Sequence, residues 1–185
     1  NISSDISPKH LEMLLSMVPK LSRVAVLVNP SNPSNTTVLK NIQVAAQKVK
    51  VKVLPVEART PQEIEKAFSA MAREKAGAVI VPRESLFISQ LRPIAELAAR
   101  HRLPSISMLL EYADAGGLMG YGSNATDIYR RAATYVDKIL KGAKPGDLPV
   151  EQPTKFELII NGRVAKALGL KIPQLLLIST DKVIE

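Results

Sequence analysis

Short valine-rich runs alternate with stretches of helical periodicity over the first two thirds of the chain. The runs at 23–28 and 76–81 are almost wholly apolar, and 51–56 is a further predicted strand. Strands buried on both faces of a parallel sheet have this composition, because no position along them faces water. The alternation predicts an α/β fold with a doubly wound parallel sheet, continued by strands at 104–107 and 117–121.

Helices are expected between these strands and before the first one. Ser7 followed by Pro8 predicts an N-cap and first helical position, with apolar residues at helical spacing up to Val18. Thr60 and Glu63 form a capping-box start for a later helix. A single helix is expected over 86–100, where apolar residues again recur with helical spacing.

The last third of the chain departs from this rhythm. It predicts a long amphipathic helix over 124–141, an irregular connector at 144–149 and a strand at 156–160. A short helix at 164–168 and a last strand at 182–184 follow. These elements either belong to a neighbouring lobe or return to the sheet.

Composition excludes several classes of protein. Hydrophobic residues make up 46% of the 185 residues, and the longest apolar runs fall far short of the roughly 20 residues of a membrane-spanning helix. Cysteine is absent, which excludes a disulfide framework and thiolate metal sites. The net charge is +8, but the basic excess is spread along the sequence and tryptophan is absent, so no nucleic-acid partner is expected.

Motifs for chemistry are absent as well. The turn after the first strand reads NPSNP, without the glycines of a dinucleotide-binding loop, and no Walker loop or G-x-S-x-G elbow occurs. The two histidines, His10 and His101, are expected to be structural. Glu84, Glu111 and Asp114 are open to three interpretations: an acid–base pair, ligand contacts or solvated surface carboxylates. The sequence therefore predicts no enzyme, no metal and no cofactor.

Ligands of doubly wound sheets bind beyond the carboxyl ends of the strands. Polar residues follow three predicted strands at that edge, in the segments 29–35, 82–85 and 107–111. They could hold a small polar ligand, although they do not form an evident catalytic centre.

Five segments together resemble the ABC transporter substrate-binding protein family. They read RVAVLVNP at 23–30, AGGLMGYG at 115–122, YRRAA at 129–133, ILKGAKP at 139–145 and LPVEQPTKFEL at 148–158. The resemblance covers essentially the whole chain. It has departures: the family often has Ser at the position of Gly120, an aromatic residue and an arginine near Ser107 and Leu110, and Asn-Leu-Lys where this chain reads NGR at 161–163.

The resemblance implies the fold of type I periplasmic binding proteins, in which two Rossmann-like lobes close on a ligand. Residues 1–19 would form a crossover and helix leading into the lobe at 20–116, and 117–185 the return crossover and C-terminal elements. The implied function is that of an extracytoplasmic or periplasmic solute receptor, with a small-molecule ligand and ABC permease subunits as partners, made with a signal peptide. The alternative is a sensor or effector domain, or an enzyme, on the same fold.

The expected ligand is an amino-acid-like zwitterion. Asn29, Ser34 and Asn35 lie where a helix N-terminus favours an anion, and Glu84 and Glu111 would suit an ammonium group. Contacts are also expected from the side chains Ser85, Ser107 and Tyr121. The alternative for this edge is that Asn35 only caps its helix and that Glu84 is solvated.

The chain is also expected to pair with itself as a homodimer. The resemblance implies a first lobe before the segment that corresponds to 7–19, and the helix at 124–141 would pack on it. Without that lobe, the apolar side of this helix would be exposed, and exposed apolar patches mark interaction surfaces.

Overall fold

A computed structural model describes residues 6–153 and 155–185. Its centre is a seven-stranded sheet in the order β2-β1-β3-β4-β5-β6-β7. The strands are β1 (Arg23–Val28), β2 (Lys52–Glu57), β3 (Ala78–Val81), β4 (Ser105–Ser107), β5 (Met119–Ser123), β6 (Phe156–Asn161) and β7 (Lys182–Ile184).

The first five strands are parallel, as the sequence predicts. Side chains of β1 alternate between two separate cores: Val24, Val26 and Val28 face one, and Ala25 and Leu27 face the other. This burial on both faces is the physical reason for the unbroken apolar run.

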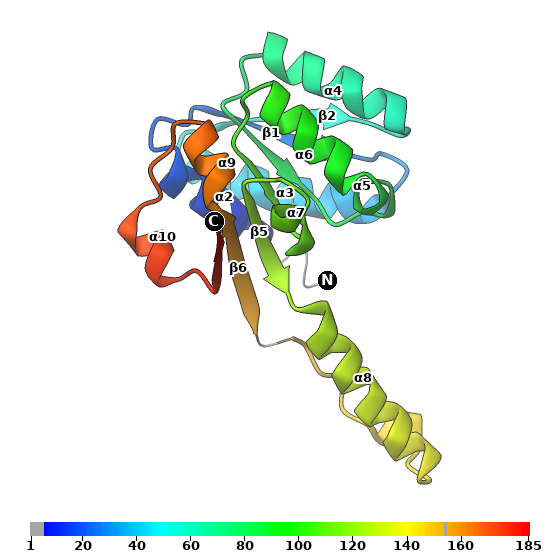
Figure 1. Ribbon diagram of the computed structural model, residues 1–185. Coiled ribbons are helices and arrows are strands. Elements are labelled where there is room, and N and C mark those ends of the chain that lie inside the picture. Colours follow the sequence, from blue (N-terminus) through cyan, green and yellow to red (C-terminus); the bar gives the residue numbers. More distant parts are fainter. Residues whose placement is uncertain (1–5, 154) are drawn as a thin grey trace.

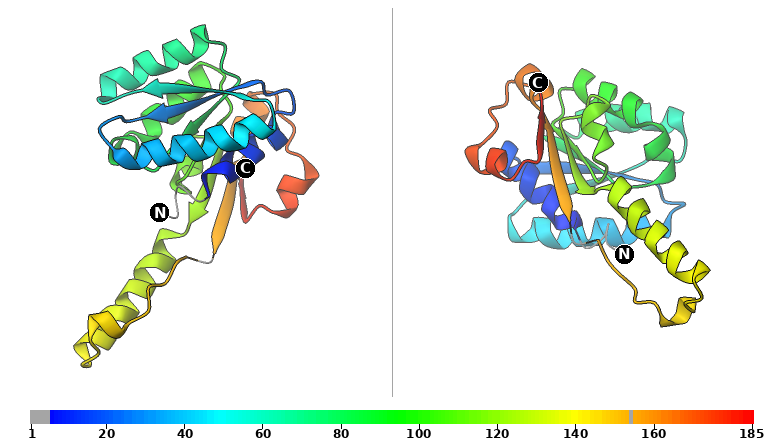
Figure 2. Two further views of the ribbon diagram at one scale, coloured as in Figure 1. Left: turned by 180° about the vertical axis from the view of Figure 1, so that it is seen from behind. Right: turned by 60° about the horizontal axis from the view of Figure 1, so that its bottom comes forward.

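Helices cover both faces of the sheet (Figures 1 and 2). One core contains residues of α2 (Ser7–Met17), α3 (Pro33–Lys48), α9 (Gly162–Ala167) and α10 (Gln174–Ile178). The other core contains residues of α4 (Pro61–Arg73), α5 (Ser85–Ser89), α6 (Leu91–Arg100) and α7 (Glu111–Asp114). The arrangement confirms the predicted doubly wound fold.

Two predicted helix boundaries are wrong. Ile6, not Ser7, is the N-cap of α2, and Ser7 is a buried residue within the helix. The single helix expected over 86–100 is divided at Gln90 into α5 and α6. Pro93 explains the division, because its ring would clash with the carbonyl group of Ser89 in a continuous helix.

The C-terminal elements return to the sheet. Strand β6 pairs antiparallel with β5, with Met119 opposite Ile160 and Ser123 opposite Phe156. Strand β7 then pairs parallel with β6. Of the two positions that the sequence left open for these strands, the structure selects the same sheet.

Helix α8 (Ala125–Leu140) leaves this body and projects away from it (Figure 1). None of its residues is buried. The chain returns along it through η1 (Pro145–Asp147), so α8 and residues 145–153 form an arm. Tyr135 donates a hydrogen bond to the carbonyl oxygen of Pro149 at 2.7 Å, and Arg131 pairs with Glu151 at 3.1 Å.

None of the helices in the described part of the chain has the length and apolar character needed to cross a membrane. Across residues 6–153 and 155–185, no group of three or more acidic or histidine side chains could hold a metal ion.

Candidate ligand-binding site

The carboxyl ends of β1 and β3 bring together residues that are far apart in the sequence. The two strands are adjacent and parallel, with Val26 opposite Ile80. Asn29 directly follows β1, and Glu84 lies three residues beyond the end of β3. The sheet therefore brings two of the predicted ligand residues into contact.

Asn29, Asn35 and Glu84 form a buried polar cluster. Asn29 Nδ2 donates to Glu84 Oε1 at 3.0 Å, and Asn35 Nδ2 donates to the backbone oxygen of Asn29 at 3.2 Å. The exposed fractions of Asn29, Asn35 and Glu84 are 9%, 3% and 7%. The alternative in which Glu84 is a solvated surface carboxylate is therefore wrong.

Asn35 does not cap its helix either. Asn32 is the N-cap of α3, and its side-chain oxygen accepts from the backbone nitrogen of Ser34 at 3.0 Å. Ser34 itself is exposed. The backbone N–H group of Ser34 is thus used by the cap and is not free for a ligand.

Glu84 has an unusual environment for a carboxylate. Its Oε2 accepts from the backbone nitrogens of Leu86 at 2.9 Å and Phe87 at 3.3 Å, which caps α5. Among the residues that the structure describes, no lysine, arginine or histidine forms an ion pair with it. A carboxylate offers about four acceptor positions, so the three bonds leave one on Oε1.

The other predicted residues of this edge do not join the cluster. Ser107 is buried, but its hydroxyl donates to the backbone oxygen of Val81 at 3.2 Å and accepts from the backbone nitrogen of Leu109 at 3.3 Å. Ser85 and Glu111 are exposed, at the starts of α5 and α7. No hydrogen bond joins any of the three to Glu84 in the described part of the protein.

Tyr121 packs against the core that contains residues of α2, α3, α9 and α10. Its ring meets the ring of His10 edge to face, with centroids 5.5 Å apart, and its backbone oxygen lies 2.9 Å from His10 Nε2. Burial raises the pKa of the Tyr121 hydroxyl above its usual value. His10 is completely buried, and loss of water around the imidazole lowers its pKa.

Two glycines of β5 allow the segment 108–110 to pack closely against this strand, a contact that the sequence analysis did not predict. A Cβ atom on Gly120 would lie 2.6 Å from the backbone oxygen of Leu109, and one on Gly122 would lie 2.6 Å from that of Met108. The backbone of 108–110 thus lies directly against β5. The G-x-G spacing on a predicted strand was the available signal, since strand glycines often mark a close backbone approach.

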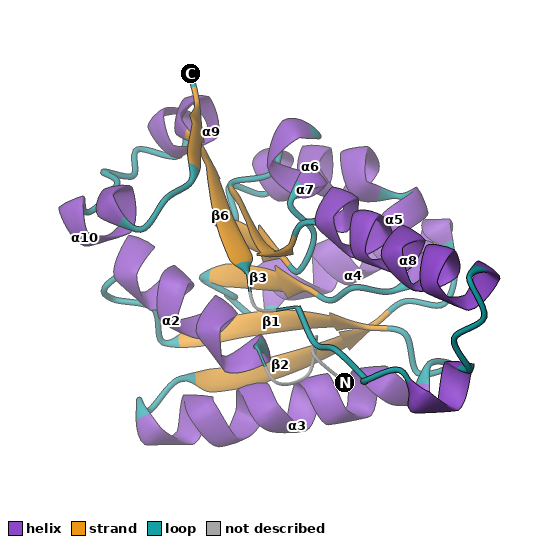
Figure 3. Cartoon of the chain, turned by 90° about the horizontal axis from the view of Figure 1, so that it is seen from below, coloured by secondary structure: helices purple, strands orange, loops and turns teal. Residues whose placement is uncertain are grey.

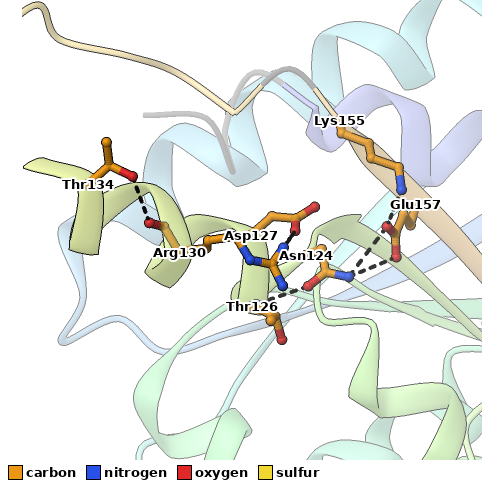
Figure 4. A network of polar contacts seen from close by, with 7 residues as sticks. All are labelled: Asn124, Thr126, Asp127, Arg130, Thr134, Lys155 and Glu157. Carbon is orange, nitrogen blue, oxygen red and sulfur yellow. Dashed lines mark hydrogen bonds and ion pairs between the residues drawn. The ribbon is translucent and has the colours of Figure 1, made fainter.

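A polar network that the sequence did not reveal stands where β5 leads into α8 (Figure 4). Asn124 caps α8 by accepting from the Thr126 nitrogen at 2.9 Å, and its Nδ2 donates to Glu157 Oε2 of β6 at 3.2 Å. Lys155 pairs with Glu157 at 2.9 Å, which holds the pKa of that carboxyl below its usual value. The network ties the base of the arm to β6.

The family model for ABC transporter substrate binding proteins matches residues 3–184. The chain belongs to this family. The resemblance carried by the five sequence segments is thereby confirmed, and so is the periplasmic binding protein fold.

The family includes relatives with more specific descriptions. The chain is 24% identical over 163 residues to a tyrosine-binding protein of Clostridioides difficile strain R20291. The alignment covers 88% of this chain and 47% of the relative. The chain thus spans about half the length of that curated relative.

Solved structures match the fold closely. A conserved domain protein of Vibrio cholerae aligns with a TM-score of 0.87 at 23% identity, over 96% of this chain and 60% of that one. An ABC domain of Streptococcus pneumonia in complex with L-Trp aligns with a TM-score of 0.86 at 22% identity, over 96% and 62%. The matching family is one of substrate-binding proteins, and the curated relative is a tyrosine-binding protein.

Proposed function

We propose that this chain is the ligand-binding lobe of the extracytoplasmic solute receptor of an ABC importer, and that its ligand is an amino acid held between this lobe and a second one. The family match and the substrate-binding relative support the receptor role. ABC permease subunits would be its partners in the membrane.

The single observation that carries the ligand class is the buried carboxylate of Glu84. A buried charge is costly unless a partner of opposite charge compensates it, and the described chain supplies only neutral donors. The open acceptor position on Oε1 would suit the ammonium group of an amino acid. Two similar proteins are a tyrosine-binding protein and a domain in complex with L-Trp, and both of these ligands agree with the amino-acid class.

The departures near Ser107 and Leu110 bear on which amino acid is bound. The backbone oxygens of 108–110 lie against β5, and the side chains of these three residues are buried. The proposal names the amino-acid class and no single member of it.

Calorimetric titration with individual amino acids tests the proposal. It uses a longer protein that contains both this lobe and the proposed second lobe. Glu84→Gln keeps the shape and a capping oxygen but removes the charge, and should weaken binding by about 2–5 kcal/mol if an ammonium group is its partner. Asn35→Ala should weaken binding less than Glu84→Gln does, because it removes only the hydrogen bond that Asn35 donates to the backbone oxygen of Asn29. Glu111→Ala, at an exposed carboxylate on the same edge, is the matched control and should bind like the parent.

Two results would count against parts of the proposal. If Glu84→Gln binds as tightly as the parent, the site assignment is wrong while the receptor role survives. If native mass spectrometry of the purified longer protein shows a bound neutral sugar, the ligand class is wrong.

Sensor domains on the same fold, such as a LacI family regulator that aligns with a TM-score of 0.65, are less well supported because that likeness concerns the fold alone.

A further inference from the structure

Three helix-to-strand turns of this protein share an unusual feature. Lys50, Lys75 and Arg102 follow α3, α4 and α6 and adopt positive φ angles of 57°, 54° and 53°. Glycine or asparagine is the usual residue in this left-handed conformation after a helix. Here each of the three positions carries a basic side chain.

The sheet places these turns in one row. The turns precede β2, β3 and β4, and those strands run parallel in the order β2-β1-β3-β4. Arg23 lies directly opposite Lys52 in the register. Adjacent strands are about 4.8 Å apart, so the starts of four strands form a compact line. Figure 3 shows β1 and β2 side by side and pointing the same way.

We call this surface the basic edge and define it by the lysines and arginines at the amino ends of the strands and the last turns of the helices. They are Lys20, Arg23, Lys48, Lys50, Lys52, Arg73, Lys75, Arg100 and Arg102. All are exposed except Arg23, which is half-buried.

Few carboxylates offset this charge. Glu74 lies on the basic edge, and Glu65, further back in α4, pairs with Arg100 at 3.6 Å. Arg23 donates to the backbone oxygen of Glu74 at 2.7 Å rather than to its carboxylate. Within the described ranges, no other residue of the basic edge forms an ion pair.

Helix stability alone does not account for the pattern. A cation near a helix C-terminus is favourable by about 0.3–1 kcal/mol. A side chain in the left-handed region costs on the order of 1 kcal/mol, which glycine would avoid. The two effects nearly cancel, so the three left-handed basic residues bring no clear gain to the fold, whereas they add charge at the surface.

We propose that the basic edge docks on an anionic lipid surface. Five of the nine residues are lysines and four are arginines. Each basic residue near such a surface adds about 1 kcal/mol of attraction. Val49, 49% exposed, is the one large exposed hydrophobic side chain that the described chain presents there, so the contact is electrostatic rather than inserted. The segments that carry these residues, 20–23, 48–52, 73–75 and 100–102, contain no phenylalanine, tyrosine or tryptophan that could stack on bases, which disfavours nucleic acid.

The position of this surface is compatible with ligand binding. It lies at the amino ends of the parallel strands, whereas Asn29 and Glu84 lie beyond the carboxyl ends. A membrane bound at the basic edge would leave the opposite edge open to solute. This inference does not depend on the identity of the solute.

Co-sedimentation with lipid vesicles tests the proposal. The 185-residue chain should bind vesicles of phosphatidylglycerol and phosphatidylcholine in about equal amounts and should not bind phosphatidylcholine alone. The triple variant Lys50→Asn, Lys75→Asn, Arg102→Asn should bind at least about 10-fold more weakly. Asparagine tolerates the left-handed conformation, so this variant should keep the melting temperature of the parent or exceed it.

The matched control is Lys40→Gln, Lys66→Gln, Lys144→Gln. It removes the same number of positive charges from exposed positions away from the basic edge. It should lose much less vesicle binding than the first triple variant. Equal losses in the two triple variants, or no binding of the parent to the anionic vesicles, would overturn the proposal. Retention of duplex DNA in place of vesicles would also overturn it and assign the edge to nucleic acid.

Discussion

The side-chain amide of Asn29 donates a hydrogen bond to Oε1 of Glu84, 3.0 Å away, and so joins the end of β1 to the start of α5. The same carboxylate caps α5 through Leu86 and Phe87. Glu84→Ala would leave three donors without their acceptor in a buried place. We expect it to lower the free energy of unfolding by about 1–3 kcal/mol, measured by urea denaturation.

Glu111→Ala provides the comparison for this prediction. Its carboxylate is exposed, so the change should stay within about 0.5 kcal/mol. A Glu84→Ala variant as stable as Glu111→Ala would show that the hydrogen bonds of Glu84 contribute nothing to the fold.

Gly120→Ala should be strongly destabilising. Its Cβ atom would lie 2.6 Å from the Leu109 oxygen and 2.8 Å from the Leu110 oxygen, both in the backbone, which cannot move aside as a flexible side chain could. Overpacking of this kind costs about 1–3 kcal/mol. Gly146→Ala is the control, since no atom lies within 4 Å of a Cβ there. Thermal melting curves should separate the two variants clearly, and similar melting temperatures would contradict the close approach of 108–110 to β5.

His10 should make stability depend on pH below neutrality. Burial lowers its pKa in the folded protein, so as pH falls through about 6.5 the unfolded chain takes up the proton first. Stability contributed by the neutral ring is therefore complete above that pH and decreases below it, by at most about 1.4 kcal/mol per pH unit. Denaturant titrations of the parent and of His10→Gln between about pH 7.5 and 5 should diverge as pH falls.

His101→Gln, at the histidine whose ring stacks on that of Phe68 with centroids 6.1 Å apart, is the matched histidine-to-glutamine control. If the free energy of unfolding changes with pH in the same way for the parent and for His10→Gln, His10 does not cause the pH dependence.

The arm should make the isolated chain self-associate, because α8 exposes large apolar side chains that the described part of the chain does not cover. Val136 and Leu140 are 56% and 82% exposed. Light scattering should give a mass that rises with concentration above that of a 20.1 kDa monomer. The double variant Val136→Glu, Leu140→Glu should reduce this association.

The matched control for the arm is Leu175→Glu, Ile178→Glu in α10, where the same kind of side chain is 81% and 74% exposed. It should associate like the parent. A constant monomer mass for the parent at all concentrations would show that the exposed face of α8 does not pair two copies.

Much of the fold could be predicted because its signals are local. The apolar run at 23–28 reflects burial on both faces, and the Thr60 cap reports a helix start through a bond to a neighbour three residues away. Helix boundaries failed where distant packing decided them, as at Ser7, whose side chain is buried rather than used as a cap.

The candidate site was predicted only in outline. The position of Asn29 and Glu84 at the carboxyl edge follows from the strand order of a parallel sheet. Their contact could therefore be predicted from the sequence. Ser107, by contrast, looks like a free hydroxyl in the sequence, yet its bonds to β3 and to Leu109 occupy it. Tyr121 turned toward His10 because alternate residues of a strand face opposite sides of the sheet.

The sequence by itself determined the elements, the parallel sheet and the family, since hydrophobic period, capping residues and motif spacing are properties of neighbouring residues. Only the tertiary structure decided that Glu84 is buried without a cation in the described chain, that β6 returns antiparallel to β5, and that basic residues spread over 20–102 meet on one edge. The physical reason is that pairing and burial join residues dozens of positions apart, and charge that is dilute along the chain becomes concentrated once parallel strands align their ends.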